Sequence, residues 1–219
     1  MVKRRELDQG LEEMQHLLVE MGKLVETALT DSMEALRTLN IPEARRVISQ
    51  DQQLNALEMQ ITEIGAKLMA TQQPVAKDLR NILACLKISG DLERMGDLAV
   101  DIAKAALRLE GQQLIKPLID LPRLAEMTRA MVADSVRSYM EQNVDLAYKL
   151  DQDDHEVDAL YSQILYELFA LMADNPGTIS QAMLLSFVGR YIERIGDHAT
   201  NIGESTVYLV TGKRPDLNT

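Results

Sequence analysis

The sequence LERMGDLA at residues 92–99 recurs as IERIGDHA at residues 192–199, 100 positions further along the chain (192 − 92). Each copy sets a Glu and an Asp four residues apart, and a third oxygen-bearing side chain follows four residues later. These side chains are Glu93, Asp97 and Asp101 in the first copy and Glu193, Asp197 and Asn201 in the second. Side chains at i and i+4 of an α-helix are neighbours on one face. The stretch therefore predicts a helix with an acidic stripe, built twice.

Apolar residues recur in steps of three and four on both sides of the two copies, which is the period of amphipathic helices. The segments predicted as helices are approximately 7–39, 41–71, 75–109, 121–142, 144–173 and 179–211. Asn40-Ile41-Pro42, Gln73-Pro74 and Asp174-Asn175-Pro176-Gly177 are turn signals between them. No segment alternates apolar and polar residues over a strand length, so we predict no sheet.

The two halves of the chain match outside the motif as well. Asn40 recurs as Asn143 and Asp51 recurs as Asp154, both at an offset of 103. Two repeats of three long helices joined by short loops favour antiparallel helix packing. We therefore predict an all-α fold with two tandem three-helix bundles related by internal duplication. Residues 1–112 form the first bundle and residues 113–219 form the second.

Charge and composition exclude several classes of protein. The net charge of −11 argues against nucleic-acid binding, which needs a surplus of Lys and Arg. Cys85 is the only cysteine, so there is no disulfide framework and no thiolate metal site. The basic residues 3–5 are not followed by an apolar stretch, so we expect no secretory signal, and the sequence has no run of about 18 apolar residues. We expect a cytoplasmic protein without membrane insertion.

A helical wheel places the acidic stripe away from the packing seam. In the segment 75–109 the apolar seam includes Ile88, Leu92 and Met95, and Glu93 and Asp97 lie on the opposite side. The segment 179–211 repeats this pattern. The wheel therefore predicts that the carboxylates lie on an outward or lateral face of each bundle.

A second acidic line runs along the segments 41–71 and 144–173. Its members are Asp51, Asn55 and Glu58 in the first half and Asp154, Asp158 and Tyr161 in the second. If the helices lie side by side, two acidic lines converge along one groove. Rows of carboxylates suit hard or borderline cations such as Mg²⁺, Ca²⁺, Mn²⁺ and iron. Because like charges at i and i+4 destabilise a helix, a bound cation would relieve their repulsion. A solvated helix face without metal is the alternative.

Other polar residues give weaker indications. Arg94 and Arg194 recur in the motif and are expected to form ion pairs with nearby carboxylates, or else to contact an anion. His198 is Leu98 in the first copy, so it has no paired histidine in the repeat. The sequence contains no glycine-rich phosphate loop and no Ser/His/Asp arrangement. We therefore predict no catalytic site.

The repeated motif and the second acidic line together resemble the PhoU family, whose members regulate bacterial phosphate uptake. The resemblance extends over nearly the whole chain, in length, helix pattern and duplication. It implies a non-enzymatic adaptor that represses the phosphate regulon by linking the ATPase of a phosphate ABC transporter to a sensor histidine kinase. It also implies a homodimer.

The resemblance further implies metal ions at the acidic stripes, with iron, zinc, manganese or magnesium as the candidates. The ligands that it implies are Asp51, Glu93, Asp97 and Asp101 in the first half, and Asp154, Asp158, Glu193, Asp197 and Asn201 in the second. Asn201 is an uncharged amide where the first half has Asp101, so the two sites are not expected to be identical. The alternative functions are an accessory regulator of a different phosphate transporter, a carboxylate-bridged metalloenzyme, and a helical scaffold that binds basic partners.

Overall fold

The computed structural model describes residues 2–213 and 215–217, with side chains from residue 5 onward. These residues form long α-helices and one short 3-10 turn, and the described part contains no strand. The elements are α1 (Val2–Thr38), α2 (Ile41–Gln72), α3 (Lys77–Arg108), α4 (Asp120–Glu141), α5 (Val144–Asp174), η1 (Pro176–Thr178) and α6 (Ile179–Thr211). The all-α prediction is confirmed. The predicted helix ends lie within two residues of the observed ones, except that α1 begins at Val2 and not at about residue 7.

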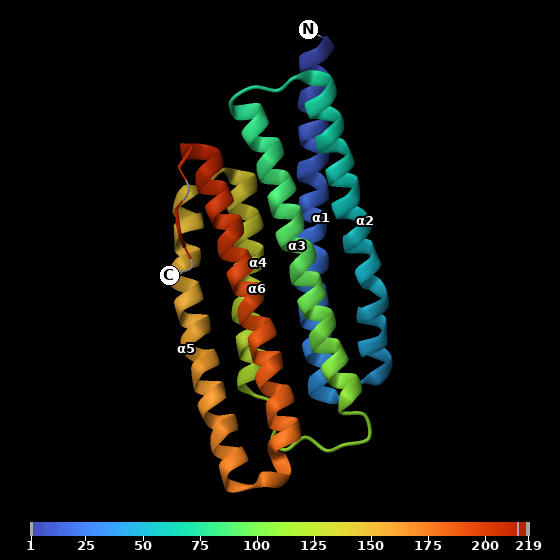
Figure 1. Cartoon of the computed structure of the whole chain (residues 1–219), viewed down its shortest axis with the longest axis vertical. Helices are drawn as coiled ribbons and strands as arrows, with labels where there is room; N and C mark the ends of the chain where they lie inside the picture. The colour runs from blue at the N-terminus through green and yellow to red at the C-terminus, as the bar shows by residue number, and fades with distance from the viewer. Residues whose placement is uncertain (1, 214, 218–219) are drawn as a thin grey trace.

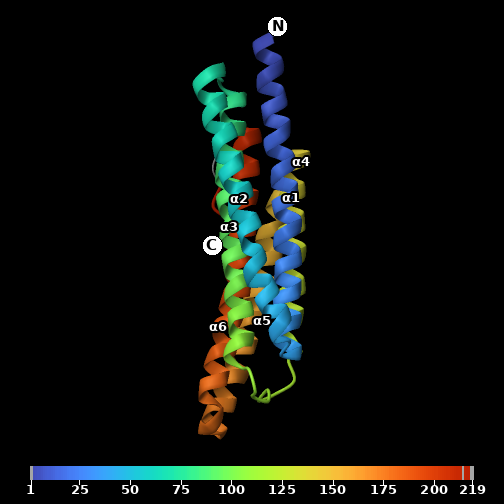
Figure 2. The ribbon, with the colours of Figure 1, turned by 90° about the vertical axis from the view of Figure 1, so that its right-hand side faces the viewer.

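The helices form two bundles that stand side by side (Figure 1). Helices α1, α2 and α3 pack against one another, and so do α4, α5 and α6. The bundles meet where α3 packs against α6 and where α1 packs against α4. In Figure 2, α3 and α6 lie on one side of the molecule and α1 and α4 lie on the other. In Figure 1, α2 and α5 lie at the two outer edges of the molecule.

Helices α3 and α6 run in opposite directions where the bundles meet. Asp91 of α3 contacts His198 of α6 at 2.9 Å, and Lys87, one turn earlier in α3, approaches Glu204, further along α6, at 3.9 Å. An earlier residue of one helix thus meets a later residue of the other. Together with the internal repeat, this relates the two bundles by an approximate two-fold axis.

The same local signal starts the second helix of each bundle. The side chain of Asn40 accepts a hydrogen bond from the backbone N–H of Glu43 at 3.2 Å, and that of Asn143 accepts one from Leu146 at 3.0 Å. Such caps satisfy N–H groups that have no partner inside the helix. The residue before each cap, Leu39 or Gln142, has a positive φ of about 50°. The repeat is therefore visible in the turns as well as in the motif.

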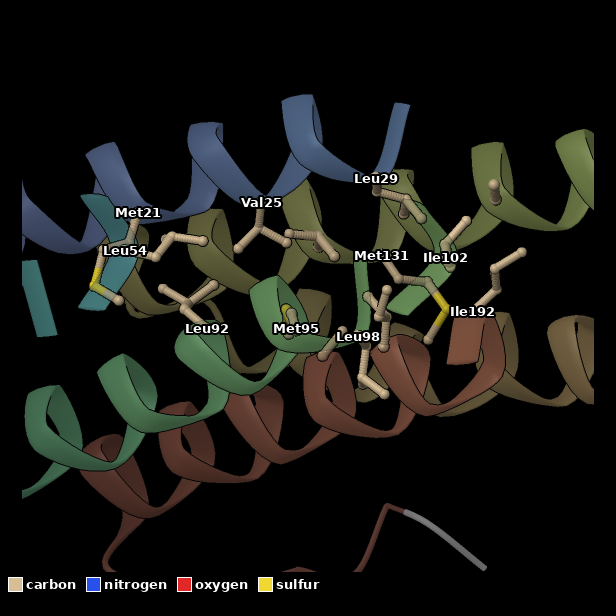
Figure 3. Close-up of a cluster of buried hydrophobic side chains, with 14 of the residues drawn as sticks. Met21, Val25, Leu29, Leu54, Leu92, Met95, Leu98, Ile102, Met131 and Ile192 are labelled. Atoms are coloured by element: carbon tan, nitrogen blue, oxygen red, sulfur yellow. The ribbon is translucent and has the colours of Figure 1, made fainter. Parts of the chain in front are cut away.

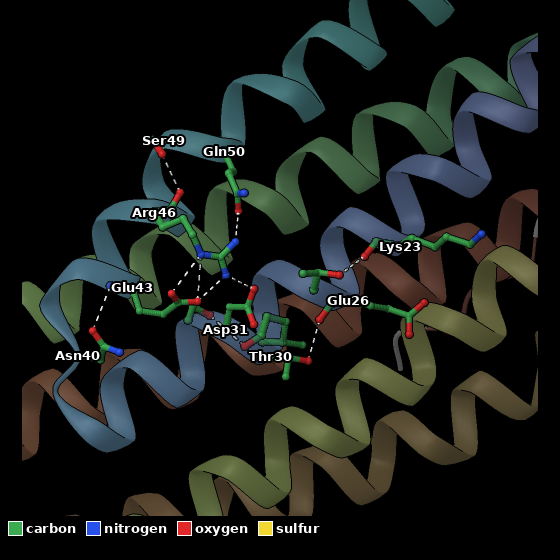
Figure 4. Close-up of polar contacts among 12 residues, drawn as sticks. Lys23, Glu26, Thr30, Asp31, Asn40, Glu43, Arg46, Ser49 and Gln50 are labelled. Carbon is green, nitrogen blue, oxygen red and sulfur yellow. Dashed lines mark hydrogen bonds and ion pairs between the residues drawn. The ribbon is translucent and has the colours of Figure 1, made fainter.

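The turn between α1 and α2 is held by one arginine (Figure 4). Arg46 of α2 donates to Asp31 of α1 at 2.6 Å, to Gln50 at 2.8 Å, and also to Glu43. The first of these bonds joins the end of α1 to the start of α2. It keeps the two helices together close to the short connection between them.

The apolar seams predicted from the periodicity are buried. On α1, Met14, Leu18, Met21 and Val25 are completely buried. The core is continuous between the bundles, since buried residues of both belong to one cluster. Figure 3 shows Met21, Val25 and Leu92 of the first bundle in the same cluster as Met131 and Ile192 of the second. Burying each such side chain contributes roughly 1.5–3 kcal/mol, so the core holds the bundles together.

The connection between the bundles is tied to α6 by one side chain. Gln181 accepts a hydrogen bond from the N–H of Ile115 at 2.6 Å and donates to the carbonyl of Gln113 at 3.1 Å. Gln181 is itself buried, so these bonds satisfy both ends of its amide.

Among the described residues, no helix combines the length and the apolar character that crossing a bilayer requires.

Candidate functional site

The acidic cluster of the second bundle lies between α5 and α6. Asp154 of α5 and Glu193 of α6 are only 5% and 7% exposed, and Asp197 is half-buried. The Oδ1 atom of Asp154 and the Oε2 atom of Glu193 are buried without a hydrogen-bond partner. Buried polar atoms are rarely left unpaired in folded proteins. These two oxygens therefore indicate a ligand or a bound proton.

The glycine of each motif has no side chain, which leaves room for a carboxylate of the neighbouring helix to approach its backbone. A Cβ atom at Gly196 would lie 3.1 Å from Asp154 Oδ1, and one at Gly96 would lie 3.2 Å from Asp51 Oδ1. A side chain at either position would press on the carboxylate. The structure thus explains why a glycine stands between the Glu and the Asp of each motif. It brings Asp51 to the α3 motif and Asp154 to the α6 motif, as the predicted groove requires.

The cluster of the first bundle, between α2 and α3, is more open. The side chains of Glu93 and Asp97 are 24% and 44% exposed, and Asp51 is half-buried with an unpaired Oδ1 atom. Arg94 donates to Asp97 at 3.1 Å and lies 3.6 Å from Glu93. Arg94 thus forms the expected ion pair with a nearby carboxylate. The first cluster holds its carboxylates closer to solvent than the second.

Burial and mutual repulsion raise the pKa values of these carboxyls. Burial raises the pKa of Asp154 to about 7, with further contributions from the charges of Asp158 and Asp197. Burial also raises the pKa of Glu193 to about 7, and the charge of Asp197 adds to the rise. The pKa values of Asp51 and Glu93 are raised by the same two causes. Both a proton and a metal cation would relieve this electrostatic strain.

The structure corrects the prediction that the acidic stripe of α3 and α6 lies on an outward or lateral face. The prediction is wrong for Glu193, which is buried because α5 packs over that side of α6. Asp154, on the second acidic line, is buried in the same place. Asp97 and Asp101 remain well exposed, with side chains 44% and 41% accessible. A helical wheel gives only the direction of a side chain from its own helix. It cannot say which neighbouring helix covers that direction.

The remaining predicted site residues surround the two clusters. Asp101 forms an ion pair with Lys104, at 2.8 Å, on the surface of α3. Asp158 is exposed on α5, and its charge contributes to the raised pKa values of Asp154, Glu193 and Asp197. Asp158 therefore belongs electrostatically to the second cluster.

Asn201 faces the junction between the bundles. Its Nδ2 donates to Asp91 Oδ1 at 3.3 Å, and His198 Nδ1 lies 2.9 Å from the same oxygen. Sequence reasoning missed Asp91 and left His198 without a partner. Asp91 precedes the motif and is Tyr191 in the other half, so the repeat gave no signal for it. This contact between the bundles is visible only in the folded chain.

The donor set of each cluster fits a hard or borderline metal ion, since the side chains that the fold brings together are carboxylates. Asp51, Glu93 and Asp97 would hold an ion in the first bundle. Asp154, Glu193 and Asp197 would hold one in the second. Within the part of the chain that the structure describes, no three such side chains already stand in an arrangement that could hold one ion together. A metal ion could therefore bind only if these side chains rotated toward one another.

Comparison with known proteins gives a consistent result over nearly the whole chain. The family model described as the PhoU domain matches twice, at residues 18–106 and 121–206. A "Phosphate-specific transport system accessory protein PhoU homolog" of Clostridium acetobutylicum is 40% identical over 98% of this chain and 99% of its own length. A homologue of the same name from Aquifex aeolicus is 40% identical over 93% of this chain and 92% of its own length.

Two crystal structures share the fold. PhoU from Pseudomonas aeruginosa matches with a TM-score of 0.90 and 34% identity, over 94% of this chain and 99% of that one. The phosphate transport system regulatory protein PhoU from Streptococcus pneumoniae matches with a TM-score of 0.88 and 29% identity, over 96% and 99%. These names describe accessory and regulatory proteins rather than enzymes, in agreement with the prediction of a non-enzymatic protein.

Proposed function

Because the chain belongs to the PhoU family, we propose that it is an accessory protein of a phosphate-specific transport system that represses the phosphate regulon when phosphate is plentiful. It acts in the cytoplasm as an adaptor between the ATPase of a phosphate ABC transporter and a phosphate sensor histidine kinase. The observation that carries this proposal is the 40% identity to a phosphate-transport accessory protein over 98% of the chain.

Metal binding at the acidic clusters is part of the proposal. The unpaired buried oxygens of Asp51, Asp154 and Glu193 support it, as does the raised pKa of each of these groups. A divalent ion would supply positive charge to carboxylates that repel one another. The ion then links α2 to α3, or α5 to α6. Its presence would stiffen the groove between those helices.

The adaptor role needs two protein partners and a suitable surface. A net charge of −11 favours contact with basic surfaces on those partners. A homodimer belongs to the same proposal and would present the adaptor surface twice. Sedimentation analysis of the purified chain tests the dimer, and a monomer at all concentrations would remove it from the proposal.

A gene deletion tests the regulatory role directly. In the deletion strain grown with abundant phosphate, a reporter driven by a phosphate-starvation promoter should become active, and the wild-type gene should silence it. The Asp51→Asn/Asp97→Asn variant should fail to silence the reporter if the first cluster serves the function. A reporter that stays silent in the deletion strain would contradict repression.

An accessory role for a different phosphate transporter is the alternative. Affinity purification of the tagged chain from cells grown with abundant phosphate separates the two possibilities. Recovery of the ABC transporter ATPase and of the sensor kinase supports the proposed adaptor. Recovery of another phosphate transporter, without these two proteins, supports the alternative.

A further inference from the structure

The chain contains two phenylalanines, and neither of them lies in the core. Phe169 of α5 is 55% exposed and Phe187 of α6 is 51% exposed. Three further large apolar side chains are exposed on the same parts of these helices: Tyr166, Ile179 and Met183. An exposed aromatic ring forgoes the free energy that its burial would contribute. Their concentration at one place therefore indicates a surface that a partner covers.

These residues lie at the end of the second bundle, where η1 connects α5 to α6. Ile179, Met183 and Phe187 follow one another at intervals of four residues, so they share one face of α6. Tyr166 and Phe169 are three residues apart and share one face of α5. In Figures 1 and 2 this end of the molecule projects beyond the turn between α1 and α2. The first bundle therefore leaves it accessible.

Helices α5 and α6 pack antiparallel in a register that two close contacts define. A Cβ atom at Gly189 would lie 2.9 Å from the ring of Tyr161, and one at Gly196 would lie 3.1 Å from Asp154 Oδ1. Seven residues forward along α6 thus correspond to seven residues back along α5. Both contacts lie on the side where the two helices face each other.

This register places Phe169 level with the helical turn between Ile179 and Met183. Phe169 follows Tyr161 by eight residues and Ile179 precedes Gly189 by ten, so each lies about 80° around its helix from that contact. Both rotations lead away from the buried core, so the two side chains meet on the outer side of the helix pair. The exposed residues thus form one continuous surface, here named the α5–α6 apolar face, which consists of Tyr166, Phe169, Ile179, Met183 and Phe187.

The first bundle does not repeat the aromatic part of this face. At the positions of the three aromatic residues it has, in the same order, Glu63, Ala66 and Lys87, at offsets of 103, 103 and 100. A three-helix bundle of this architecture therefore folds without aromatic side chains at these positions. The aromatic residues of the second bundle thus suit binding rather than folding.

Two arginines continue the exposed stripe of α6 beyond its apolar residues. Arg190 follows Phe187 by three residues and Arg194 follows by four more, so the stripe stays on one side of the helix. Both arginines are exposed, and Arg190 also pairs with Glu193. The stripe from Ile179 to Arg194 extends over about 22 Å, at about 1.5 Å per residue. It is apolar at one end and basic at the other, in a chain whose net charge is −11.

We propose that the α5–α6 apolar face, with Arg190 and Arg194, binds an amphipathic helix of a partner protein. Apolar residues of that helix cover the face, and acidic residues one or two turns further along it reach the two arginines. A helix fits because side chains spaced by three and four residues form ridges that pack into the grooves of another helix. The inference rests on the proposed function in one respect, which is that an adaptor needs protein partners.

Charge also distinguishes this occupant from two others. The net charge of −11 opposes binding to an anionic membrane. A second copy of the chain would place the arginines of one α6 against the apolar residues or the arginines of the other, because a two-fold axis pairs a surface with itself. An acidic amphipathic helix matches both ends of the stripe.

A labelled model peptide tests the inference by fluorescence anisotropy with the full chain. The peptide is a helix of about 20 residues with leucines on one face of its first half and glutamates continuing that face in its second half. Phe169→Gln with Phe187→Gln should weaken its binding by about tenfold or more, because aromatic anchors supply much of the affinity of an interface. Arg194→Glu should weaken it by about threefold and should strengthen binding of a peptide with lysines in place of the glutamates.

Met59→Gln is the matched control, because Met59 is 60% exposed on α2 and lies outside the face. It should leave peptide binding unchanged, and circular dichroism verifies that each variant is folded. A wild-type protein that does not bind the peptide, or a Phe169→Gln/Phe187→Gln variant that binds it equally well, overturns the inference. Peptide binding is read separately from the reporter in the deletion strain, so failure of the inference is distinguishable from failure of the proposed function.

Two further measurements on the Phe169→Gln/Phe187→Gln variant examine the other occupants. A wild-type dimer that this variant converts to a monomer in sedimentation analysis would assign the face to a second copy of the chain. Wild-type binding to phosphatidylglycerol vesicles that this variant abolishes would assign it to a membrane. Either result overturns the inference, and an unchanged oligomeric state with no vesicle binding supports it.

Discussion

Arg129 of α4 donates a hydrogen bond to Glu26 of α1 at 3.1 Å, and the two residues are counterparts in the internal repeat (129 − 103 = 26). Where two repeats pack about a two-fold axis, a residue on the axis meets its own counterpart. Identical repeats would place two like charges together there. The opposite charges of Glu26 and Arg129 therefore suit the pairing of one repeat with the other within a single chain.

Reversing one of these charges should weaken the junction between the bundles. Arg129→Glu places two carboxylates together in a half-buried position, and we expect the free energy of unfolding to fall by about 1–2 kcal/mol. Glu26→Arg in the same chain should restore part of the loss. Urea unfolding of the single and double variants measures the coupling. If the stability of the double variant equals the value expected from adding the two single effects, the two residues are not coupled and the pair contributes nothing.

Alanine should have opposite effects at two glycines of α3. A Cβ atom at Gly96 would collide with a side-chain carbon of Leu54 and crowd Asp51, so Gly96→Ala should lower stability by about 1–3 kcal/mol. Gly90 has open space around its Cα, and Gly90→Ala should stabilise the helix by about 0.4–1 kcal/mol. Thermal unfolding compares the two. Equal effects would mean that the close approach at Gly96 does not matter for packing.

The metal-free protein should lose stability as the pH rises. Folding raises the pKa values of Asp154 and Glu193 to about 7, well above their values in the unfolded chain. At a pH between the unfolded and the folded pKa, the folded chain therefore binds more protons than the unfolded chain. Their contribution is full below about pH 4 and is lost as the pH rises through about 7. We expect a decrease on the order of 3 kcal/mol between about pH 5 and pH 8.

Chelator-treated protein and urea unfolding at each pH measure this decrease. The Asp154→Asn/Glu193→Gln variant is the control, because it removes both titrating groups and should flatten the pH dependence. A wild-type protein that becomes more stable over the same interval would mean that these carboxyls are ionised when buried.

Removing two carboxylates of the first cluster should separate metal binding from folding. Glu93→Ala with Asp97→Ala should lower the metal content of the purified protein and leave the helical circular dichroism nearly intact. Both side chains are partly exposed, and neither belongs to the apolar core. Elemental analysis gives the first result. A large loss of helix would instead assign these carboxylates a structural role.

The single thiol should be inert in the folded protein. Cys85 is fully buried, its Sγ lies 2.8 Å from the hydroxyl of Tyr139, and burial raises the pKa of the thiol to about 11. A thiol reagent such as dithionitrobenzoate should therefore react only when the chain is unfolded in denaturant. Rapid reaction of the native protein would show that the core around Cys85 opens.

Helix boundaries, the repeat and the identity of the acidic residues could be predicted because they depend on local features. Asn40 and Asn143 cap a helix through a neighbour three residues away. The seam of α1 follows the helical period, and Met14, Leu18, Met21 and Val25 of this seam are completely buried. The pairing of Asp51 with the first motif and Asp154 with the second followed from the assumption that consecutive helices pack side by side.

The tertiary structure alone decided which polar groups are buried and with what they pair. The sequence determined that Glu193 and Asp154 belong to acidic lines. The packing of α5 against α6 decided that both carboxylates are buried. The contacts of Asp91 with His198 and of Glu26 with Arg129 join residues more than 100 positions apart. Such contacts depend on how the two bundles pack against each other, and the periodicity of a single helix does not predict that packing. The motif at 92–99 and its copy at 192–199 are therefore alike in sequence, and their surroundings make them unequal.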